Sequence, residues 1–173
     1  MLESIQTKIG FVFSDESLLE LALTHKSFDS KSNNERLEFL GDTVLSSIIS
    51  QYLFLKYPEI SEGLLSRIRS QLVKSDTLSK KAKSLKLHKA VKLSKGTLNI
   101  NDSHKKSIYE GCLEALVGAV YLDGGWDQAT LVTINIFSDE LSNISTDNSF
   151  KDPKTELQEL FQSLGMSPPE YNH

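Results

Sequence analysis

The sequence contains few of the residues that stabilise small secreted or zinc-binding proteins. It has one cysteine, Cys112, so no internal disulfide can form, and no cysteine pair has the spacing of a zinc site. Only 4 of the 173 residues are proline, and the balance of 39% hydrophobic and 24% charged residues is typical of folded globular proteins. A disulfide-rich or zinc-finger protein is excluded, and a reducing, cytoplasmic location is expected.

An excess of positive charge is also absent. There are 19 Lys and Arg against 23 Asp and Glu, a net charge of -4, so any contact with nucleic acid must be local. The N-terminus lacks the pattern of a signal peptide, and the longest apolar stretch, near 115–122, is too short to span a bilayer, so no membrane association is expected. The 4 histidines pair with no obvious nucleophile, which leaves Ser–His or Cys–His catalysis with little support.

Apolar residues recur at helical spacing along the chain, and strand-like alternation is almost absent. This pattern predicts an all-α fold. The segment carrying Ile108, Cys112 and Leu116 is apolar almost all round and should lie at the centre of a helical bundle. Helices are expected at about 33–57, 62–74, 75–87, around 108–123 up to Gly124-Gly125, and 127–141, with a loop at 94–103.

A polar, turn-rich run predicts a domain boundary near the C-terminus. Residues 1–143 form the expected main domain, and 144–151 have the composition of a linker. Residues 152–173 open with an N-cap and a proline at the first helical position, followed by an apolar face. About twenty residues cannot bury a core of their own.

Acidic residues share one face of the predicted helix at 33–57. Glu35, Glu38 and Asp42 stand at i, i+3 and i+7. One interpretation is structural, with Glu35 closing a capping box with Ser32 and the other acids solvated. Against it stands Gly41, because glycine inside a helix costs about 1 kcal/mol relative to alanine and suits a position where another backbone approaches closely. A close helix crossing beside Glu38 and Asp42 is therefore expected.

The central helix carries the acids Glu110 and Glu114 within an otherwise apolar segment. No Lys or Arg occurs between Lys106 and Lys151 to pair with them locally. A buried carboxylate must be protonated, ion-paired or bound to metal. Oxygen ligands without cysteine or nearby histidine favour magnesium or manganese, and such ions support phosphodiester hydrolysis by activating water.

The run 34–42, Asn-Glu-Arg-Leu-Glu-Phe-Leu-Gly-Asp, resembles the signature of bacterial ribonuclease III. The resemblance covers nearly the whole chain and includes Leu23-Thr24-His25-Lys26-Ser27, Glu62-Gly63 with Ser66 and Arg69, 114–119 through Asp123, and 152–155 with 157–159. It implies an all-α endonuclease domain in 1–143 that is dimeric and cuts double-stranded RNA. It also implies that 152–173 is the first helix of an incomplete double-stranded-RNA-binding domain.

The resemblance assigns roles to individual residues. Asp42 and Glu114 correspond to the essential catalytic carboxylates, and Glu38 corresponds to a metal ligand. Glu35 and Glu62 are expected to line the valley that faces RNA. Phe39 is expected to pack into the partner of a homodimer in which each protomer cuts one strand, leaving a 5′-phosphate and short 3′ overhangs. The implied cofactor is Mg²⁺, with Mn²⁺ as a possible substitute.

One position departs from the family pattern. The family usually has an aspartate three residues before the second essential glutamate, where this chain has Gly111. Glu110 lies about 40° from Glu114 around the helix, at about 100° per residue, and so shares its face. Two hypotheses follow: Glu110 substitutes as a metal ligand, or water fills the gap, which magnesium tolerates.

Lysines gather between positions 74 and 95, where there are eight of them and a single acid, Asp76. The run is either a solvated helix surface or a site that meets the phosphates of an A-form duplex.

Two other functions compete with a nuclease. The first is a catalytically impaired family member that binds double-stranded RNA without cutting it. The second is a di-iron helical bundle, although the Glu-x-x-His pairs of such sites are absent.

Overall fold

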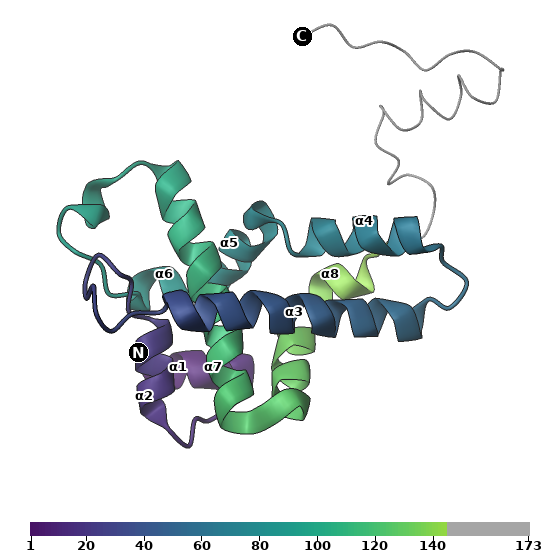
Figure 1. Ribbon diagram of the computed structural model, residues 1–173, viewed down its shortest axis with the longest axis horizontal. Helices are drawn as coiled ribbons and strands as arrows, with labels where there is room; N and C mark the ends of the chain where they lie inside the picture. The colour runs from purple at the N-terminus through teal and green to yellow at the C-terminus, as the bar shows by residue number, and fades with distance from the viewer. Residues whose placement is uncertain (145–173) are drawn as a thin grey trace, which may run out of the picture. The chain divides into compact units, whose positions relative to one another are not determined.

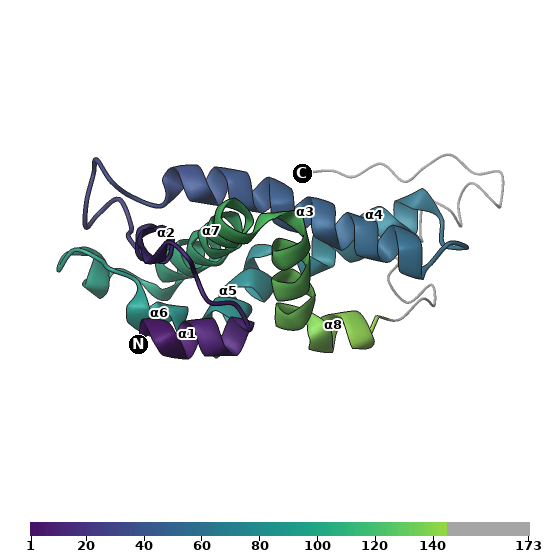
Figure 2. The ribbon, with the colours of Figure 1, turned by 90° about the horizontal axis from the view of Figure 1, so that it is seen from below.

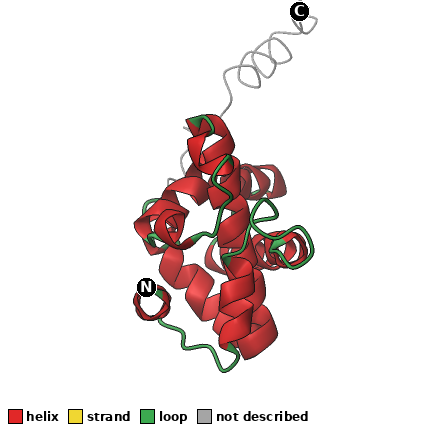
Figure 3. Ribbon diagram, turned by 90° about the vertical axis from the view of Figure 1, so that its left-hand side faces the viewer, coloured by secondary structure: helices red, strands yellow, loops and turns green. Residues whose placement is uncertain are grey.

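The structure of this chain is a computed structural model that describes residues 1–144, except for the side chains of residues 99, 102 and 103. Residues 1–143 form a compact unit. The described part is helical, as expected, and its one strand-like feature is an isolated bridge between Thr24 and Lys92 (Figure 3). The linker and the RNA-binding helix expected at 144–151 and 152–173 lie outside the described residues, apart from Ile144, and stay predictions.

The helices follow the sequence pattern closely. The three expected at 33–57, 62–74 and 75–87 are each found within a few residues of the predicted ends. In chain order the elements are α1 (Leu2–Ile9), α2 (Glu16–Ala22), α3 (Glu35–Lys56), α4 (Glu62–Leu72), α5 (Ser75–Ser84), α6 (Leu87–Ala90), the 3-10 helix η1 (Thr97–Asn99), α7 (Asp102–Ile136) and α8 (Ser138–Ser142).

Helix α7 forms the centre of the unit, as its apolar sequence predicts. Its residues between Cys112 and Val120, apart from Glu114, are fully buried or nearly so. It passes between α3 on one side and α1 and α6 on the other (Figure 2). The helix is interrupted at Gly125, whose φ of 77° and ψ of -174° are not helical, at the predicted break. Glycine has no Cβ to clash in this conformation.

Helix α3 is the other main element. It crosses α7, and its second half lies beside α4, so that α3 and α4 form a hairpin extending away from the crossing (Figure 1). The apolar face of α3, with Leu45, Ile48 and Ile49 fully buried, packs on the core. The first half of α3 therefore meets the middle of α7, where the acidic residues lie.

Two sequence-based expectations need correction. The helix expected at 127–141 ends at Ile136, and α8 follows after a break at Phe137, whose ring is fully buried. Burial of this ring redirects the chain, an effect that periodicity alone does not encode. The segment 94–103, expected to be a loop, contains η1 and the start of α7, where the side chain of Asn101 accepts a hydrogen bond from the backbone of His104.

The described residues contain no helix that is both long and apolar enough to cross a membrane. A cytoplasmic location stays a prediction.

Candidate active site

The site is built on a close crossing of α3 and α7 at two glycines. A Cβ on Gly41 would overlap the backbone carbonyl of Glu114 and lie 2.9 Å from the backbone nitrogen of Gly118. A Cβ on Gly118 would lie 3.3 Å from the Cα of Gly41. Only residues without side chains permit this approach. The close crossing expected beside Glu38 and Asp42 is confirmed.

The crossing brings together four acidic residues that are far apart in the sequence. Glu38 and Asp42 come from α3, and Glu110 and Glu114 come from α7. The charges of the other three all raise the pKa of Glu114. The charges of Asp42 and Glu110 also raise the pKa of Glu38. The structure therefore places the acids predicted as catalytic or metal-binding within electrostatic reach of one another.

Burial and mutual repulsion make the charged forms of two of these acids unfavourable. Burial, followed by the charges of the neighbouring acids, raises the pKa of Glu114 to about 8. Burial also raises the pKa of Glu38, with Glu35 as the next cause. Among described residues, Lys26 is the one cation acting on either pKa, and it opposes the rise at Glu38. A cation bound here would relieve the repulsion.

Glu38 occupies the space left by Gly111. A Cβ on Gly111 would lie 2.5 Å from one carboxylate oxygen of Glu38 and 2.7 Å from its carboxyl carbon. The room that a side chain at position 111 would need is therefore filled by a carboxylate from α3. Neither of the two sequence-based hypotheses for this position included Glu38.

Glu110 is held by a residue that the sequence analysis did not single out. The hydroxyl of Ser75, the first residue of α5, donates a hydrogen bond of 2.5 Å to one carboxylate oxygen of Glu110. The other oxygen has no hydrogen-bond partner among the described residues. A carboxylate offers about four lone-pair positions, so this bond leaves Glu110 able to bind a further group.

The four carboxylates fit a magnesium or manganese ion by their chemistry. They supply oxygen ligands only, and none of the four forms an ion pair with a lysine or arginine within the described part of the chain. No three acidic, histidine or cysteine side chains among the described residues are already arranged to hold a metal ion. Magnesium commonly binds through one or two carboxylates and keeps several waters, so a preformed cage is not required.

Glu35 lies at the edge of this group and is not a helix cap. Its carboxylate forms an exposed ion pair of 2.7 Å with Lys26. The N-cap of α3 is Asn34, so the capping box between Ser32 and Glu35 is wrong. The backbone nitrogen of Glu35 instead donates to the side chain of Asn33.

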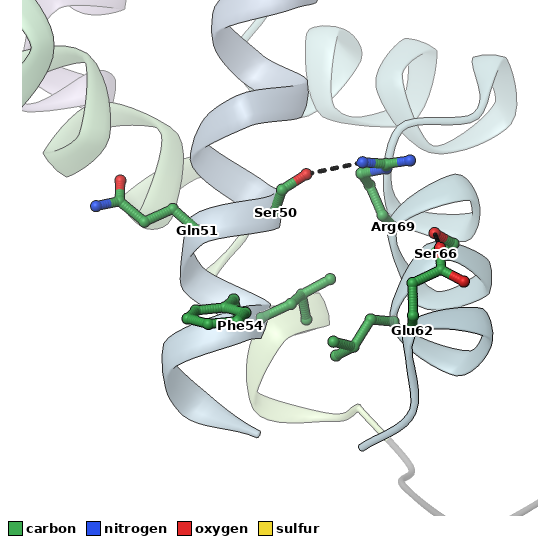
Figure 4. Close-up of a pocket in the computed structure, with 8 residues that line it drawn as sticks. Ser50, Gln51, Phe54, Glu62, Ser66 and Arg69 are labelled. Carbon is green, nitrogen blue, oxygen red and sulfur yellow. Dashed lines mark hydrogen bonds between the residues drawn. The ribbon is translucent and has the colours of Figure 1, made fainter. Parts of the chain in front are cut away.

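Glu62 lies far from the four carboxylates at the crossing of α3 and α7. It begins α4 and accepts a hydrogen bond of 2.7 Å from Ser66. Both residues line a pocket of about 400 Å³ between α3 and α4, across from Phe54 (Figure 4). Phe54 is about 18 Å along α3 from Asp42, at about 1.5 Å per residue. The structure therefore does not bring Glu62 to the four carboxylates.

Phe39 protrudes from the surface beside an apolar groove. Phe39 is 80% exposed, and in the sequence of α3 it stands between the acids Glu38 and Asp42. The groove has a volume of about 780 Å³ and is bordered by α2, the start of α3 and α7. Phe39 itself lines it with Leu18, Leu21, Leu40 and Leu122, and charged residues at its edge include Lys31, Glu35 and Arg36. A large exposed aromatic side chain beside an apolar groove is typical of an interaction surface.

The lysine-rich segment is partly engaged within the chain. Lys81 forms an ion pair of 2.5 Å with Glu140, and Lys92 forms one of 3.2 Å with Glu20. Lys83 lies over the ring of Tyr109 at 5.7 Å. Other lysines of the segment are exposed and form no ion pair within the described part of the chain; they are Lys80, Lys86, Lys89 and Lys95.

Residues 15–140 match the model of a protein family described as ribonuclease-III-like. The chain belongs to the ribonuclease III family. It is 42% identical over 170 residues to ribonuclease 3 of Ectopseudomonas mendocina, a match that covers 98% of this chain and 74% of that protein. It is also 42% identical over 167 residues to ribonuclease 3 of Thiobacillus denitrificans, covering 96% and 74%.

Solved structures agree with this assignment. The nuclease domain of ribonuclease III from Campylobacter jejuni, described as structurally flexible in the region involved in dimer formation, superimposes with a TM-score of 0.78 at 37% identity. That match covers 82% of this chain and 99% of the other. Dicer from Pichia stipitis matches with a TM-score of 0.59 at 27% identity, covering 88% and 68%.

Membership of the ribonuclease III family confirms three expectations. The fold class is the helical bundle of a ribonuclease III nuclease domain, the signature at 34–42 is that of the family, and the enzyme class is an endoribonuclease of the ribonuclease III type. The di-iron interpretation finds no support in these matches.

Proposed function

We propose that this chain hydrolyses phosphodiester bonds of double-stranded RNA with a divalent metal ion, Mg²⁺ or Mn²⁺, and produces a 5′-phosphate and short 3′ overhangs. The observation that supports this function best is the glycine crossing, which places Asp42 of α3 beside Glu114 of α7. These are the two carboxylates to which the resemblance to the ribonuclease III family assigns catalysis. Each comes from a different helix, so only the folded chain brings them together.

The residues that would hold the metal ion are Glu38, Asp42, Glu110 and Glu114. When bound, the ion would supply Lewis-acid stabilisation of phosphoryl oxygens and a more acidic water as the nucleophile. Burial and the neighbouring acids raise the pKa of Glu114 to about 8, so its carboxyl group would lose a proton if it were to bind a cation. Glu38 rests against Gly111, and its carboxylate therefore stays on the side of α3 that faces α7.

The proposed function includes a homodimer formed through Phe39. A symmetric dimer uses the same surface on both subunits, so a protruding side chain and the groove that receives it must lie on one face. Phe39 and the groove bordered by Leu18 and Leu122 meet this requirement. With two protomers, each strand of a duplex would meet one set of carboxylates. Glu35 and Glu62, both exposed, would face the RNA.

A second candidate function is binding of double-stranded RNA without cleavage. Two observations favour it: position 111 has no side chain, and the acids are not already arranged around a metal position within the described residues. Cleavage of a long RNA duplex, with and without Mg²⁺, distinguishes the two functions. The nuclease cuts the duplex only with Mg²⁺, and Glu114→Gln abolishes cutting. If the chain only binds RNA, the wild type leaves the duplex uncut both with and without Mg²⁺.

A further inference from the structure

The hydrogen bond from Ser75 to Glu110 joins two helices at the candidate active site. Ser75 is the first residue of α5, and Glu110 is 35 positions later on α7. The bond is 2.5 Å long and partly buried. Beside it, Asp76 forms an ion pair with Lys106, one helical turn before Glu110. The start of α5 is thus attached to α7 by two polar contacts, of which one involves a site carboxylate.

We propose that Ser75 is a positioning residue that holds Glu110 as a metal ligand in place of the side chain that Gly111 lacks. This inference rests on the proposed function. Glu110 is the neighbouring acid on the same helix, and its charge acts on both Glu38 and Glu114. The hydroxyl of Ser75 is the one hydrogen-bond donor to the carboxylate of Glu110 within the described part of the chain.

The geometry explains why Glu110 needs a support. A glutamate has more rotatable bonds than an aspartate and loses more conformational freedom when it is fixed. Glu38 already fills the space directly over Gly111, so that space is closed to the side chain of Glu110. A hydrogen bond to one oxygen restricts the carboxylate and leaves the second oxygen free. Groups that orient metal ligands in this way affect metal affinity although they do not touch the ion.

Binding of Mn²⁺, measured by electron paramagnetic resonance of the free ion, tests the proposal without relying on cleavage. We expect Ser75→Ala to weaken Mn²⁺ binding by about 10-fold, the lower end of the effects seen for residues that support metal ligands. Ser75→Thr retains the hydroxyl and should bind Mn²⁺ close to the wild-type affinity. Ser75→Ala removes one partly buried hydrogen bond and should lower the melting temperature by only about 2–4 °C, so the protein stays folded. Ser75→Thr retains the bond and should keep the wild-type melting temperature.

A double-mutant cycle with Glu110→Gln asks whether Ser75 acts through Glu110. If it does, Ser75→Ala causes no further loss of Mn²⁺ affinity when Glu110 is already glutamine. Equal affinity of wild type and Ser75→Ala would overturn the proposal. An additive loss in the double variant would also overturn it, because Ser75 would then act elsewhere.

The matched control is the double variant Asp76→Asn with Lys106→Gln. It removes the neighbouring contact between α5 and α7 without changing the net charge. We expect it to bind Mn²⁺ like the wild type. If it reproduces the loss seen in Ser75→Ala, the serine only docks the helix and the proposal is wrong.

The proposal and the proposed function can fail separately. If the wild type cuts a duplex with Mg²⁺ while Glu110→Gln leaves Mn²⁺ affinity unchanged, the nuclease function is supported and the proposed role of Ser75 is wrong. If the wild type neither binds Mn²⁺ nor cuts the duplex, both the nuclease function and the role of Ser75 are wrong.

Discussion

The backbone of Gly41 on α3 lies against the carbonyl group of Glu114 on α7, with no room for a side chain between them. We therefore predict that Gly41→Ala is strongly destabilising, although alanine is the better helix former. Overpacking in a core costs about 1–3 kcal/mol, and here the obstacle is rigid backbone, so the cost should reach or exceed about 3 kcal/mol. Urea denaturation followed by circular dichroism measures it.

Gly63→Ala is the matched control for this substitution. Gly63 is also in a helix, α4, but a Cβ there would have nothing within 4 Å. The free energy of unfolding should stay the same or rise by up to about 1 kcal/mol, because only helix propensity changes. A Gly41→Ala variant as stable as Gly63→Ala would show that the helices do not cross as described.

The metal-free protein should lose stability as pH rises. The pKa of Glu114 in the folded chain is about 8, above its ordinary value of 4.5. Its contribution to stability is therefore full below about pH 4.5 and is lost as pH rises through 8. Since Glu114 is only half-buried, solvent screening reduces the effect to on the order of 1–2 kcal/mol.

Urea denaturation with a chelator at pH 5.5, 7 and 9 checks this pH dependence. Glu114→Gln should flatten the profile and be more stable than the wild type at pH 9. The raised pKa of Glu38 acts in the same direction, so a small slope should persist in this variant. The same pH dependence in wild type and Glu114→Gln would contradict the burial and repulsion described for Glu114.

Much of this arrangement could be predicted from the sequence because it depends on local patterns. The period of the apolar residues located α3, α4 and the central α7. The cost of a helix-interior glycine at position 41 predicted a close crossing, and the structure confirms it. The spacing of Glu110 and Glu114 placed both on one helix face. These features follow from helix geometry and require no knowledge of neighbouring helices.

The contacts between helices could not be predicted in the same way. Glu38 turns into the space over Gly111, and Ser75 reaches Glu110 across 35 residues. Both depend on side-chain orientation after packing, which spacing along one helix does not encode. The ion pair of Glu35 with Lys26, from the preceding loop, was likewise not predicted. Two of the incorrect expectations were instead local: the N-cap of α3 is Asn34, and α7 begins directly after the N-cap Asn101.

Reversal of an exposed lysine in the segment 74–95 should weaken RNA binding. Lys86 and Lys89 are exposed and form no ion pair within the described residues, whereas Lys81 is held by Glu140. We predict that Lys86→Glu and Lys89→Glu each lower duplex affinity and reduce the slope of log K against log salt by about 1, the effect of one lost phosphate contact. Filter binding at several salt concentrations in Ca²⁺ measures both quantities.

The control for these variants is Lys56→Glu at the end of α3, which makes the same change in net charge outside the segment. It should leave the salt slope unchanged. If all three variants behave alike, the lysines act only through net charge and the segment is a solvated surface.

Phe39→Ala should dissociate the proposed dimer while leaving the protomer folded. The ring is 80% exposed in the isolated chain, so its removal creates no cavity within the protomer. Truncation of a central aromatic residue in an interface commonly costs about 2 kcal/mol or more, which corresponds to a rise of about 30-fold in the dissociation constant. Sedimentation equilibrium measures the dissociation constant, and circular dichroism checks the helix content. Leu131→Ala is the matched control because Leu131 is also exposed, at 64%, but does not border the groove beside Phe39. A monomeric wild type, or equal dissociation of the Phe39 and Leu131 variants, would show that this surface is not the dimer interface.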